Sequence, residues 1–489
     1  MSTKYPPLPK ALPLPVLREL AAAVGEANVV WRPQDLLVYE YDATIGRAMP
    51  SVVVLPASAE EVAACVRVAG RHGLPVVPRG AGTGLSGGAL AVHGGVVVST
   101  MRMNRILEVN AEERFAVVEP GLVNLRLTEA AARHGLFYAP DPSSQKACTI
   151  GGNVAENSGG PHCLALGTTT NHVLGLECVL ADGAIVRLGG WGVERPGYDL
   201  TGLVVGSEGT LCIVTKVCVR LLPVPEAVTT LLAVFDTIDQ ATEVVSEVIA
   251  SGLLPAALEM IDKYVIRAVE PVLHIGFPLD AEAVLLIEVD GLREAVDEDA
   301  RVAEAICREH GAREVRAAER PEERARLWQG RKESIGALGR LAPNYYILDG
   351  VVPRSKLPEV LRRVYEVSER YGFLCANVFH AGDGNLHPNL MFDEREPGAT
   401  ERVLECGGEI LRLCVEAGGA ISGEHGVGHE KRDYMRWIYG EDDLSAMELL
   451  KEVFGATDRF NPCKILPTGH GCGETQQSTI ERLGPGAWV

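Results

Sequence analysis

The sequence lacks the features that would attach it to a nucleic acid, a membrane or an iron–sulfur cluster. Its 46 lysines and arginines are outnumbered by 65 acidic residues, and the net charge of −19 repels phosphate backbones and anionic lipids. No stretch reaches the ~18 apolar residues of a membrane span, and the proline-rich segment 1–20 has no secretion signal. No Cys-x-x-Cys motif occurs, so no cluster is expected on this chain. We expect a cytoplasmic protein that reaches the inner face of the membrane, if at all, through a partner.

The twelve cysteines occur in a chain long enough to form two or more domains with large cores. Most of them, such as Cys65, Cys178, Cys212 and Cys218, stand among aliphatic residues. In a chain without a secretion signal this placement predicts buried thiols rather than disulfides.

The densest glycine-rich stretch is Pro78–Gly88, which we interpret as a phosphate cradle. Gly82, Gly84 and Gly87 formally match the dinucleotide fingerprint, which requires a helix directly after the loop. Residues 89–95 are followed by a strand-like run, Val96–Ser99, which leaves no room for that helix. A strand–loop–strand cradle is therefore expected, and a nicotinamide-dependent enzyme is disfavoured.

Two more segments, 140–160 and 202–214, are also rich in glycine, and we interpret both as loops. One such loop alone would be explained by tight turns. Three of them in one chain indicate a bound ligand. A flavin-free metal-binding scaffold would leave the three loops unexplained.

The spacing of apolar residues predicts alternating helices and strands on both sides of a boundary at Pro223–Pro225. Before it we expect helices at 14–24, 58–72 and 125–134, with strands at 52–55, 74–77, 96–98 and 116–118. After it a weak repeat predicts strands at 231–235, 257–260, 284–289, 314–317, 345–352 and 375–379, with helices at 238–249, 295–309 and 357–371. This pattern predicts an α+β domain with helices on one face of a largely antiparallel sheet.

Two histidines, His380 and His387, flank an Asp-Gly turn. If 382–385 forms a hairpin turn, the two histidines oppose each other with Cβ atoms about 5 Å apart, close enough to share an ion. Glu424, beside His425 in a glycine-rich segment, offers a third ligand. A lone histidine is usually an ordinary surface or core residue, but two histidines and a carboxylate resemble a catalytic metal site, for which zinc, manganese or ferrous iron would be suitable.

Two further features remain ambiguous when taken alone. Arg331 presents a guanidinium suited to a carboxylate, although a single arginine on a helix is more often solvated. The segment 459–467 is too polar for a core element and is expected to return toward a cofactor.

Together these residues resemble the FAD-linked 2-hydroxyacid dehydrogenases of the vanillyl-alcohol oxidase type. The resemblance covers about residues 35 to 467 and is closest to the branch of the flavin-binding glycolate oxidase chains and the FAD-linked D-lactate dehydrogenases. It is carried by Arg79–Thr83, Ile150–Asn153, Gly206–Thr210, His380, His387, Gly330–Lys332, Asp349–Arg354, Gly423–Gly426, Asn461, Pro462 and Lys464. Cys463 stands where the family usually has glycine, a departure that affects the geometry of the local turn and not the assignment.

The resemblance implies an FAD-binding domain over 1–223, a substrate or cap domain over 224–420 whose antiparallel sheet is covered by helices, and a segment 421–489 that returns to the flavin. It implies non-covalent FAD, bound by Pro78, Arg79, Gly80, Ala81, Gly82, Thr83, Gly84, Ser86, Gly87, Pro140, Asp141, Ser144, Gly151, Gly152, Asn153, Asn157, Gly159, Gly160, Glu208, Gly209, Ile213 and Asn461. It also implies His380, His387 and Glu424 as metal ligands, Arg331 as the anchor of a substrate carboxylate, and His425 as the general base.

The implied reaction is hydride transfer from a small D-2-hydroxy acid to the flavin. Electrons would then pass to a quinone, another soluble acceptor, or a flavin or iron–sulfur partner subunit. Relatives that oxidise 2-hydroxyglutarate hold its second carboxylate with an arginine, a threonine and a lysine. This chain keeps only the arginine, Arg331, and has Ile335 and Ile347 at the other two positions. Unpaired burial of a carboxylate is costly, so glycolate or D-lactate is expected, with 2-hydroxyglutarate or another larger acid as the alternative.

Overall fold

The computed structural model describes residues 11–191, 196–318, 320–456, 459–467 and 469, which divide into two compact units. Unit 1 comprises Met1–Ser158, Thr168–Pro223 and Glu424–Val489, and unit 2 comprises Gly159–Gly167 and Val224–Gly423. Among the described residues, no helix has the length and apolar character needed to cross a bilayer. In the part of the chain that the structure describes, ten cysteines are free thiols and nine of these are buried, as expected, whereas Cys463 is disulfide-bonded.

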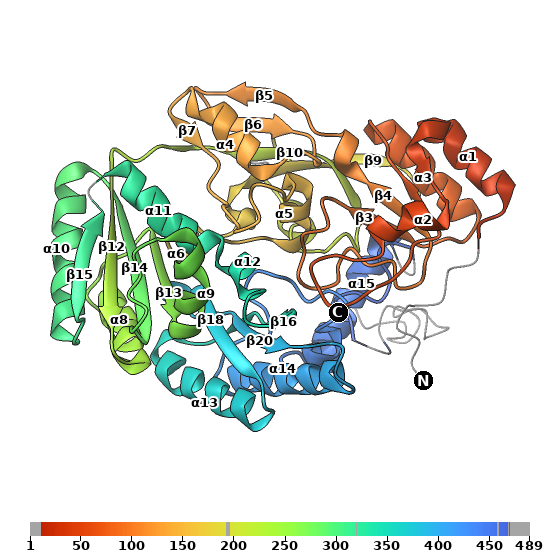
Figure 1. Ribbon diagram of the computed structural model, residues 1–489. Coiled ribbons are helices and arrows are strands. Elements are labelled where there is room, and N and C mark those ends of the chain that lie inside the picture. Colours follow the sequence, from red (N-terminus) through yellow and green to blue (C-terminus); the bar gives the residue numbers. More distant parts are fainter. Residues whose placement is uncertain (1–10, 192–195, 319, 457–458, 468, 470–489) are drawn as a thin grey trace. The chain divides into compact units, whose positions relative to one another are not determined.

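Unit 1 contains two main sheets, and Figure 1 shows their strands in red to yellow. Its helices are α1 (Leu14–Val24), α2 (Pro33–Leu36), α3 (Ala59–Arg71), α4 (Asn124–Ala132), α5 (Ile150–Glu156), α7 (Leu200–Val204) and α15 (Glu441–Val453). Its strands are β1 (Val29–Val30), β2 (Val52–Val54), β3 (Val76–Arg79), β4 (Val96–Ser99), β5 (Ile106–Asn110), β6 (Phe115–Val118), β7 (Leu136–Phe137), β8 (Val173–Val179), β9 (Ile185–Gly189), β10 (Ile213–Arg220) and β11 (Leu222–Pro223).

The first sheet of unit 1 has the order β1-β2-β4-β3, and β4 pairs in parallel with both β2 and β3. Helices α1 and α3 pack on its valines. Ser58 caps α3 by accepting a hydrogen bond from the Glu61 amide, as the spacing predicts. The glycine-rich stretch lies between β3 and β4, and residues 89–95 form turns rather than a helix, so the strand–loop–strand prediction is confirmed.

The second sheet of unit 1 is antiparallel, with the order β5-β6-β10-β8-β9. Helices α4 and α5 pack on one face of it. The prediction of a loop throughout 140–160 is wrong, because α5 occupies part of that segment. Thr149 caps α5 by accepting a hydrogen bond from the Gly152 amide, and this cap offsets the low helix propensity of Gly151 and Gly152.

Unit 2 is built around an antiparallel sheet with the core order β15-β12-β14-β13-β18. Its strands are β12 (Ala227–Phe235), β13 (Ala257–Asp262), β14 (Ala283–Gly291), β15 (Glu314–Ala318), β16 (Asn344–Ile347), β17 (Gly350–Val351), β18 (Leu374–His380), β19 (Asn385–Leu386) and β20 (Pro388–Phe392). Its helices are α6 (Cys163–Leu166), α8 (Ile238–Ala250), α9 (Lys263–Leu273), α10 (Arg293–Glu309), α11 (Pro321–Lys332), α12 (Ser334–Leu338), α13 (Leu357–Arg370) and α14 (Ala399–Glu416). The single strand expected at 345–352 is two strands, β16 and β17.

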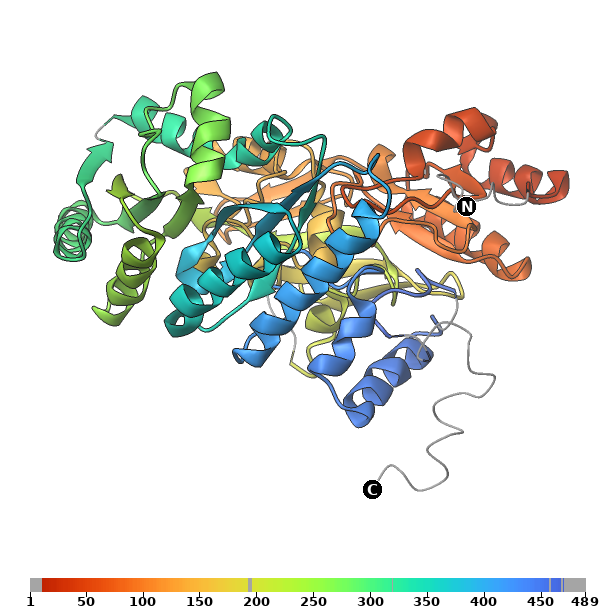
Figure 2. The same ribbon diagram turned by 60° about the horizontal axis from the view of Figure 1, so that its bottom comes forward.

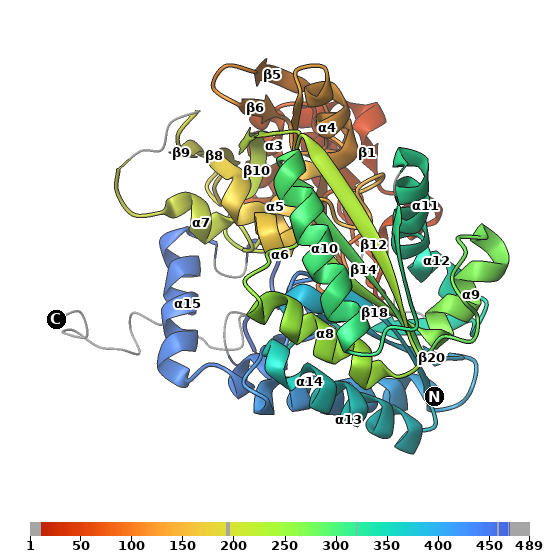
Figure 3. The same ribbon diagram turned by 90° about the vertical axis from the view of Figure 1, so that its left-hand side faces the viewer.

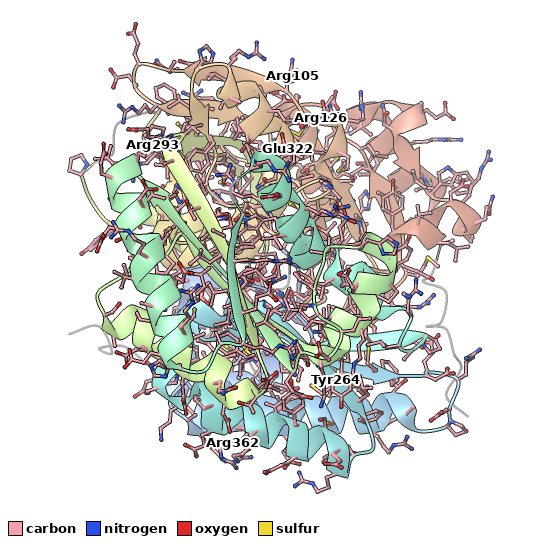
Figure 4. The ribbon with its side chains drawn as sticks, turned by 60° about the vertical axis from the view of Figure 1, so that its left-hand side comes forward. Arg105, Arg126, Tyr264, Arg293, Glu322 and Arg362 are labelled. Atoms are coloured by element: carbon pink, nitrogen blue, oxygen red, sulfur yellow. The ribbon has the colours of Figure 1, made fainter. Side chains whose placement is uncertain are left out.

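Helices cover both faces of this sheet, so the prediction of helices on one face is wrong. Figure 3 shows α8 and α10 on one side and α9, α11 and α12 on the other. Arg293 at the start of α10 and Glu322 in the first turn of α11 mark the two layers, with strands passing between them (Figure 4). Helices α13 and α14 pack against each other (Figure 2). The fold is therefore α+β, as expected.

Asp262 joins four elements of unit 2 at the end of β13. Its fully buried carboxylate caps α9 by accepting hydrogen bonds from the amides of Tyr264 and Val265. It also accepts from the Tyr365 hydroxyl of α13 at 2.9 Å and from the Asn377 amide of β18 at 2.7 Å. One side chain thus fixes how two helices meet β18.

We predict that Asp262→Ala lowers the free energy of unfolding by about 2–4 kcal/mol, because a helix cap is lost and buried donors are left without acceptors. Thr237→Ala is the matched control, since Thr237 caps α8 at an exposed position by accepting a single amide hydrogen bond, and should cost about 1 kcal/mol. Urea denaturation of both variants measures the two losses. Equal losses would contradict the prediction.

Candidate functional site

The centre of the polar cluster in unit 2 is a cross-strand pair between β13 and β18. Glu259 lies directly opposite His380 in the antiparallel register, so both side chains emerge on the same face of the sheet. The His380 Nδ1 atom is 2.7 Å from Glu259 Oε1, and both residues are buried. The carboxylate therefore accepts the Nδ1 proton and places the lone pair of the ring on Nε2, the nitrogen that can bind a metal.

Arg331 reaches the same carboxylate from the last turn of α11. Its Nε donates to Glu259 Oε2 at 2.6 Å, and its Nη2 lies 3.5 Å from His380 Nδ1. Only 2% of Arg331 is exposed, so the alternative of a solvated helix charge is wrong. Burial alone would raise the pKa of Glu259, but the charge of Arg331 and the hydrogen bonds from Arg331 and His380 outweigh burial and hold that pKa below its usual range.

His387 completes a pair of imidazoles in unit 2. The ring centres of His380 and His387 are 5.1 Å apart, with the ring planes at 86°. His387 Nδ1 donates to the Leu348 carbonyl at 3.3 Å, which again directs the lone pair to Nε2. The expected register is wrong, because His380 lies opposite Asn385 rather than His387. A short 3₁₀ turn at Ala381–Asp383 brings the two rings together instead.

Asp349 holds the end of unit 2 beside these histidines. Its Oδ2 accepts hydrogen bonds from Ser422 Oγ at 2.6 Å and from the Gly423 amide at 3.1 Å, and its Oδ1 lies 3.9 Å from His387 Nδ1. A Cβ at Gly423 would come within 2.5 Å of Asn385, so only glycine fits. Glu424 is the next residue in the chain, and the peptide geometry keeps its Cα about 3.8 Å from that of Gly423. Two imidazoles and a carboxylate are a donor set that fits a divalent cation.

In unit 1, the three glycine-rich segments converge. A Cβ on Gly80 would lie 2.3 Å from Thr149 Oγ1, and one on Gly209 would lie 2.7 Å from Pro78. The C-terminal segment joins them, because the Asn461 amide donates to the Val76 carbonyl, and Asn461 Nδ2 donates to the carbonyls of Gly88 and Glu208. The backbones therefore line one cradle that larger side chains would fill.

Several buried polar atoms in this cradle have no protein partner among the described residues. They are Arg79 Nη1, Glu208 Oε2 and Asn461 Oδ1. Burial without a hydrogen bond is costly, so these atoms fit a polar ligand that supplies both donors and acceptors. The pyrophosphate and flavin ring of FAD have that character, and the residues present therefore fit FAD.

One buried carboxylate, Glu208, and one half-buried carboxylate, Glu156, lie beside the segment that follows His425. Glu208 Oε1 accepts from the Val427 amide at 2.7 Å, and Glu156 Oε2 accepts from Ser86 Oγ at 3.3 Å. Position 426 requires glycine, because an added Cβ would lie 2.5 Å from Glu156 and 2.8 Å from Glu208. Burial raises the pKa of Glu208 to about 7, and burial together with the charge of Glu208 raises the pKa of Glu156 well above its usual value.

No function could be assigned to Glu259, Asp349 or Glu156 from the sequence alone. Glu259 gave one signal, because it is a charged residue inside the otherwise apolar run Ala257–Ile261. A carboxylate in a buried strand requires a positively charged partner, and that requirement could have directed attention to Arg331.

Family models match both units. The model described as the FAD binding domain matches residues 50–189, and the one described as FAD linked oxidases, C-terminal domain, matches residues 224–465. The solved structure of p-cresol methylhydroxylase with substrate bound covers 95% of this chain and 99% of its own, with a TM-score of 0.79 and 17% identity. A 4-ethylphenol oxidase from Gulosibacter chungangensis gives 0.76 and 20%, covering 95% and 100%. These likenesses confirm the expected vanillyl-alcohol oxidase-type fold.

Closer relatives are similar over nearly their whole length. Glycolate oxidase subunit GlcD of Escherichia coli (strain K12) is 46% identical over 94% of this chain and 92% of its own, and that of Bacillus subtilis (strain 168) is 43% identical over 92% and 96%. A D-lactate dehydrogenase of Archaeoglobus fulgidus is 37% identical over 89% and 97%. These matches exclude the nicotinamide-dependent and flavin-free alternatives. The chain belongs to the FAD-linked oxidase family that includes these proteins, and it is an FAD-linked oxidoreductase.

Proposed function

We propose that this protein oxidises a small D-2-hydroxy acid, glycolate or D-lactate, to the 2-oxo acid, with FAD and a divalent cation. The observation that carries the proposal is the cluster of Arg331, His380 and His387 around Glu259 in unit 2. A guanidinium beside two histidines is suited to a substrate with a carboxylate next to a hydroxyl. The names of the relatives, glycolate oxidase and D-lactate dehydrogenase, support the same substrate class.

The residues have separate roles in this proposal. When bound, FAD supplies the hydride acceptor and the cation supplies a positive charge that polarises the hydroxyl and the carboxylate. Arg331 binds the substrate carboxylate, and His425 accepts the hydroxyl proton as general base, a role worth about 10²–10⁴-fold in rate. The Glu208 carboxylate holds the backbone directly after His425 by accepting from the Val427 amide, and Glu156 lies against Gly426.

We propose His380, His387 and Glu424 as the ligands of the cation, for which zinc is suitable and manganese or ferrous iron would also serve. The glycine-rich cradle of unit 1, with Arg79, Glu208 and Asn461, would hold FAD without a covalent bond. Electrons would leave to a quinone, another soluble acceptor, or a flavin or iron–sulfur partner subunit.

The proposed substrate is small because the expected positions for a second carboxylate are apolar. Ile335, on α12, packs against the core of unit 2, and Ile347 ends β16. A carboxylate against these side chains would lose hydration without gaining a cation. A hydrogen or a methyl group suits them better, and one methyl group discriminates by only about 1–3 kcal/mol.

We predict that Gly80→Ala weakens FAD binding about tenfold or more, because the new Cβ would lie 2.3 Å from Thr149 Oγ1 and force the loop away from α5. Flavin absorbance per chain after dialysis measures retention. Gly339→Ala is the control, since its Cβ would meet nothing closer than 3.8 Å, and it should retain FAD fully. Full retention in the Gly80 variant would refute the cradle.

We predict that His387→Ala removes the cation and turnover while FAD stays bound, because the flavin cradle belongs to unit 1. Elemental analysis and flavin absorbance on the same sample separate the two effects. Full activity of wild-type enzyme after chelation and dialysis would rule out the metal.

We predict that glycolate and D-lactate reduce the flavin with kcat/KM values at least tenfold above the value for D-2-hydroxyglutarate. The difference, about 1.4 kcal/mol or more, reflects the lost hydration of a second carboxylate that has no paired cation. Anaerobic stopped-flow reduction with the three acids measures this ratio and also tests the proposed function. An equal or higher value for D-2-hydroxyglutarate would overturn the assignment of a small substrate.

A further inference from the structure

We propose that Glu259 is a positioning residue that sets the metal affinity of the site through His380 and orients Arg331 for the substrate. The inference rests on the proposed function, since it concerns the ligands of the proposed cation. Glu259 is fully buried in the middle of β13 and has one oxygen for each partner: Oε1 for His380 Nδ1 and Oε2 for Arg331 Nε.

Glu259 determines the tautomer of His380. A carboxylate only accepts hydrogen bonds, so an imidazole whose Nδ1 faces it carries the proton there and presents its lone pair at Nε2. Such carboxylate–histidine pairs orient the ring and raise its basicity as a ligand, and their loss typically weakens metal binding 10–100-fold.

Glu259 also orients Arg331. Its Nε donates to Glu259, which uses the side edge of the guanidinium and fixes the plane of the group. Its Nη2 lies 3.5 Å from His380 Nδ1, so this side edge faces the Glu259–His380 pair. A guanidinium whose plane is fixed in this way is suited to bind a carboxylate. The single carboxylate thus aligns a metal ligand and a substrate anchor with each other.

A second buried glutamate on the same face of the sheet shows what a purely structural carboxylate looks like. Glu288 of β14 accepts from Thr230 Oγ1 at 2.5 Å, from Trp328 Nε1 at 2.5 Å and from His162 Nε2 at 3.1 Å. None of these three partners belongs to the proposed metal or substrate residues. Glu288 therefore offers a matched control with similar burial and a similar number of hydrogen bonds.

The decisive variant is Glu259→Gln, which preserves volume. A glutamine amide has one acceptor and one donor edge, so it can satisfy either Arg331 or His380 but not both. With its oxygen toward Arg331, its NH₂ group faces His380 Nδ1 and favours the ring tautomer with the proton on Nε2, which cannot bind a metal. The variant also removes a negative charge beside the cation.

The test is a titration of chelator-treated, flavin-loaded protein with Zn²⁺, followed by calorimetry, for wild type, Glu259→Gln, Glu288→Gln and His387→Ala. We expect the Zn²⁺ Kd of Glu259→Gln to rise 10–100-fold, with Glu288→Gln unchanged. We also expect the KM for the hydroxy acid to rise in Glu259→Gln at saturating metal, because a neutral amide oxygen holds Arg331 more weakly than a carboxylate does. Flavin absorbance and thermal unfolding report whether each variant is folded.

The outcomes separate the two proposals. If His387→Ala abolishes Zn²⁺ binding and Glu259→Gln leaves Kd unchanged, the positioning role is overturned while the metal site stands. If His387→Ala binds Zn²⁺ like wild type, the metal site itself fails. An equal loss of affinity in Glu288→Gln would show a general structural effect and would also overturn the inference. If Glu259→Gln does not fold, Glu259→Asp, which keeps the charge, must still raise Kd.

Discussion

The backbone pairing of β13 with β18 determines the chemistry available to unit 2. In this register Glu259 faces His380, and a shift of one residue would turn one of the two side chains to the opposite face of the sheet. Asp262 limits such a shift, because its carboxylate binds the Asn377 amide of β18 while capping α9. The same strands that form the core of unit 2 therefore align its polar cluster.

Unit 1 achieves a comparable result with backbone rather than side chains. Its glycine-rich segments approach one another at distances that no Cβ could tolerate, and Asn461 ties the C-terminal segment to two of them. The result is a surface of amides and carbonyls around a few buried polar side chains, which suits a ligand that has polar atoms along its whole length. Glu208, whose pKa is raised to about 7, holds the loop after His425 through the Val427 amide, and Glu156, whose pKa is also raised, lies beside that loop.

The sequence predicted elements whose apolar residues keep a clear period, such as α3, α10 and α13, but it did not predict others, among them α14 and α15. It did not predict α11, which buries only Leu327, Gly330 and Arg331 and so has no apolar stripe. It missed α5 because Gly151 and Gly152 conceal a helix that depends on the Thr149 cap. It also did not predict α9 and α12. Because α9, α11 and α12 form the second layer of unit 2, the prediction placed helices on one face of the sheet instead of two.

The candidate site shows a similar division. His380, His387 and Arg331 could be found because each stands in a distinctive local motif. Glu259 could not be assigned, because its partners lie 72 and 121 residues away in the chain: His380 meets it through strand register and Arg331 through the packing of α11. The turn between the histidines was also misjudged, since Gly384 adopts a positive φ that ends a 3₁₀ turn rather than completing a two-residue hairpin.

The segmented path of the chain through unit 1 has a consequence for biosynthesis. The segment around Phe460 pairs with Val76 of β3, so the first sheet of unit 1 gains this partner only after all of unit 2 has been synthesised. Unit 2, apart from Gly159–Gly167, is one continuous stretch that is complete earlier. Domains fold as units during synthesis. We therefore expect unit 2, which lies between two parts of unit 1 in the sequence, to fold before the cradle of unit 1 is assembled.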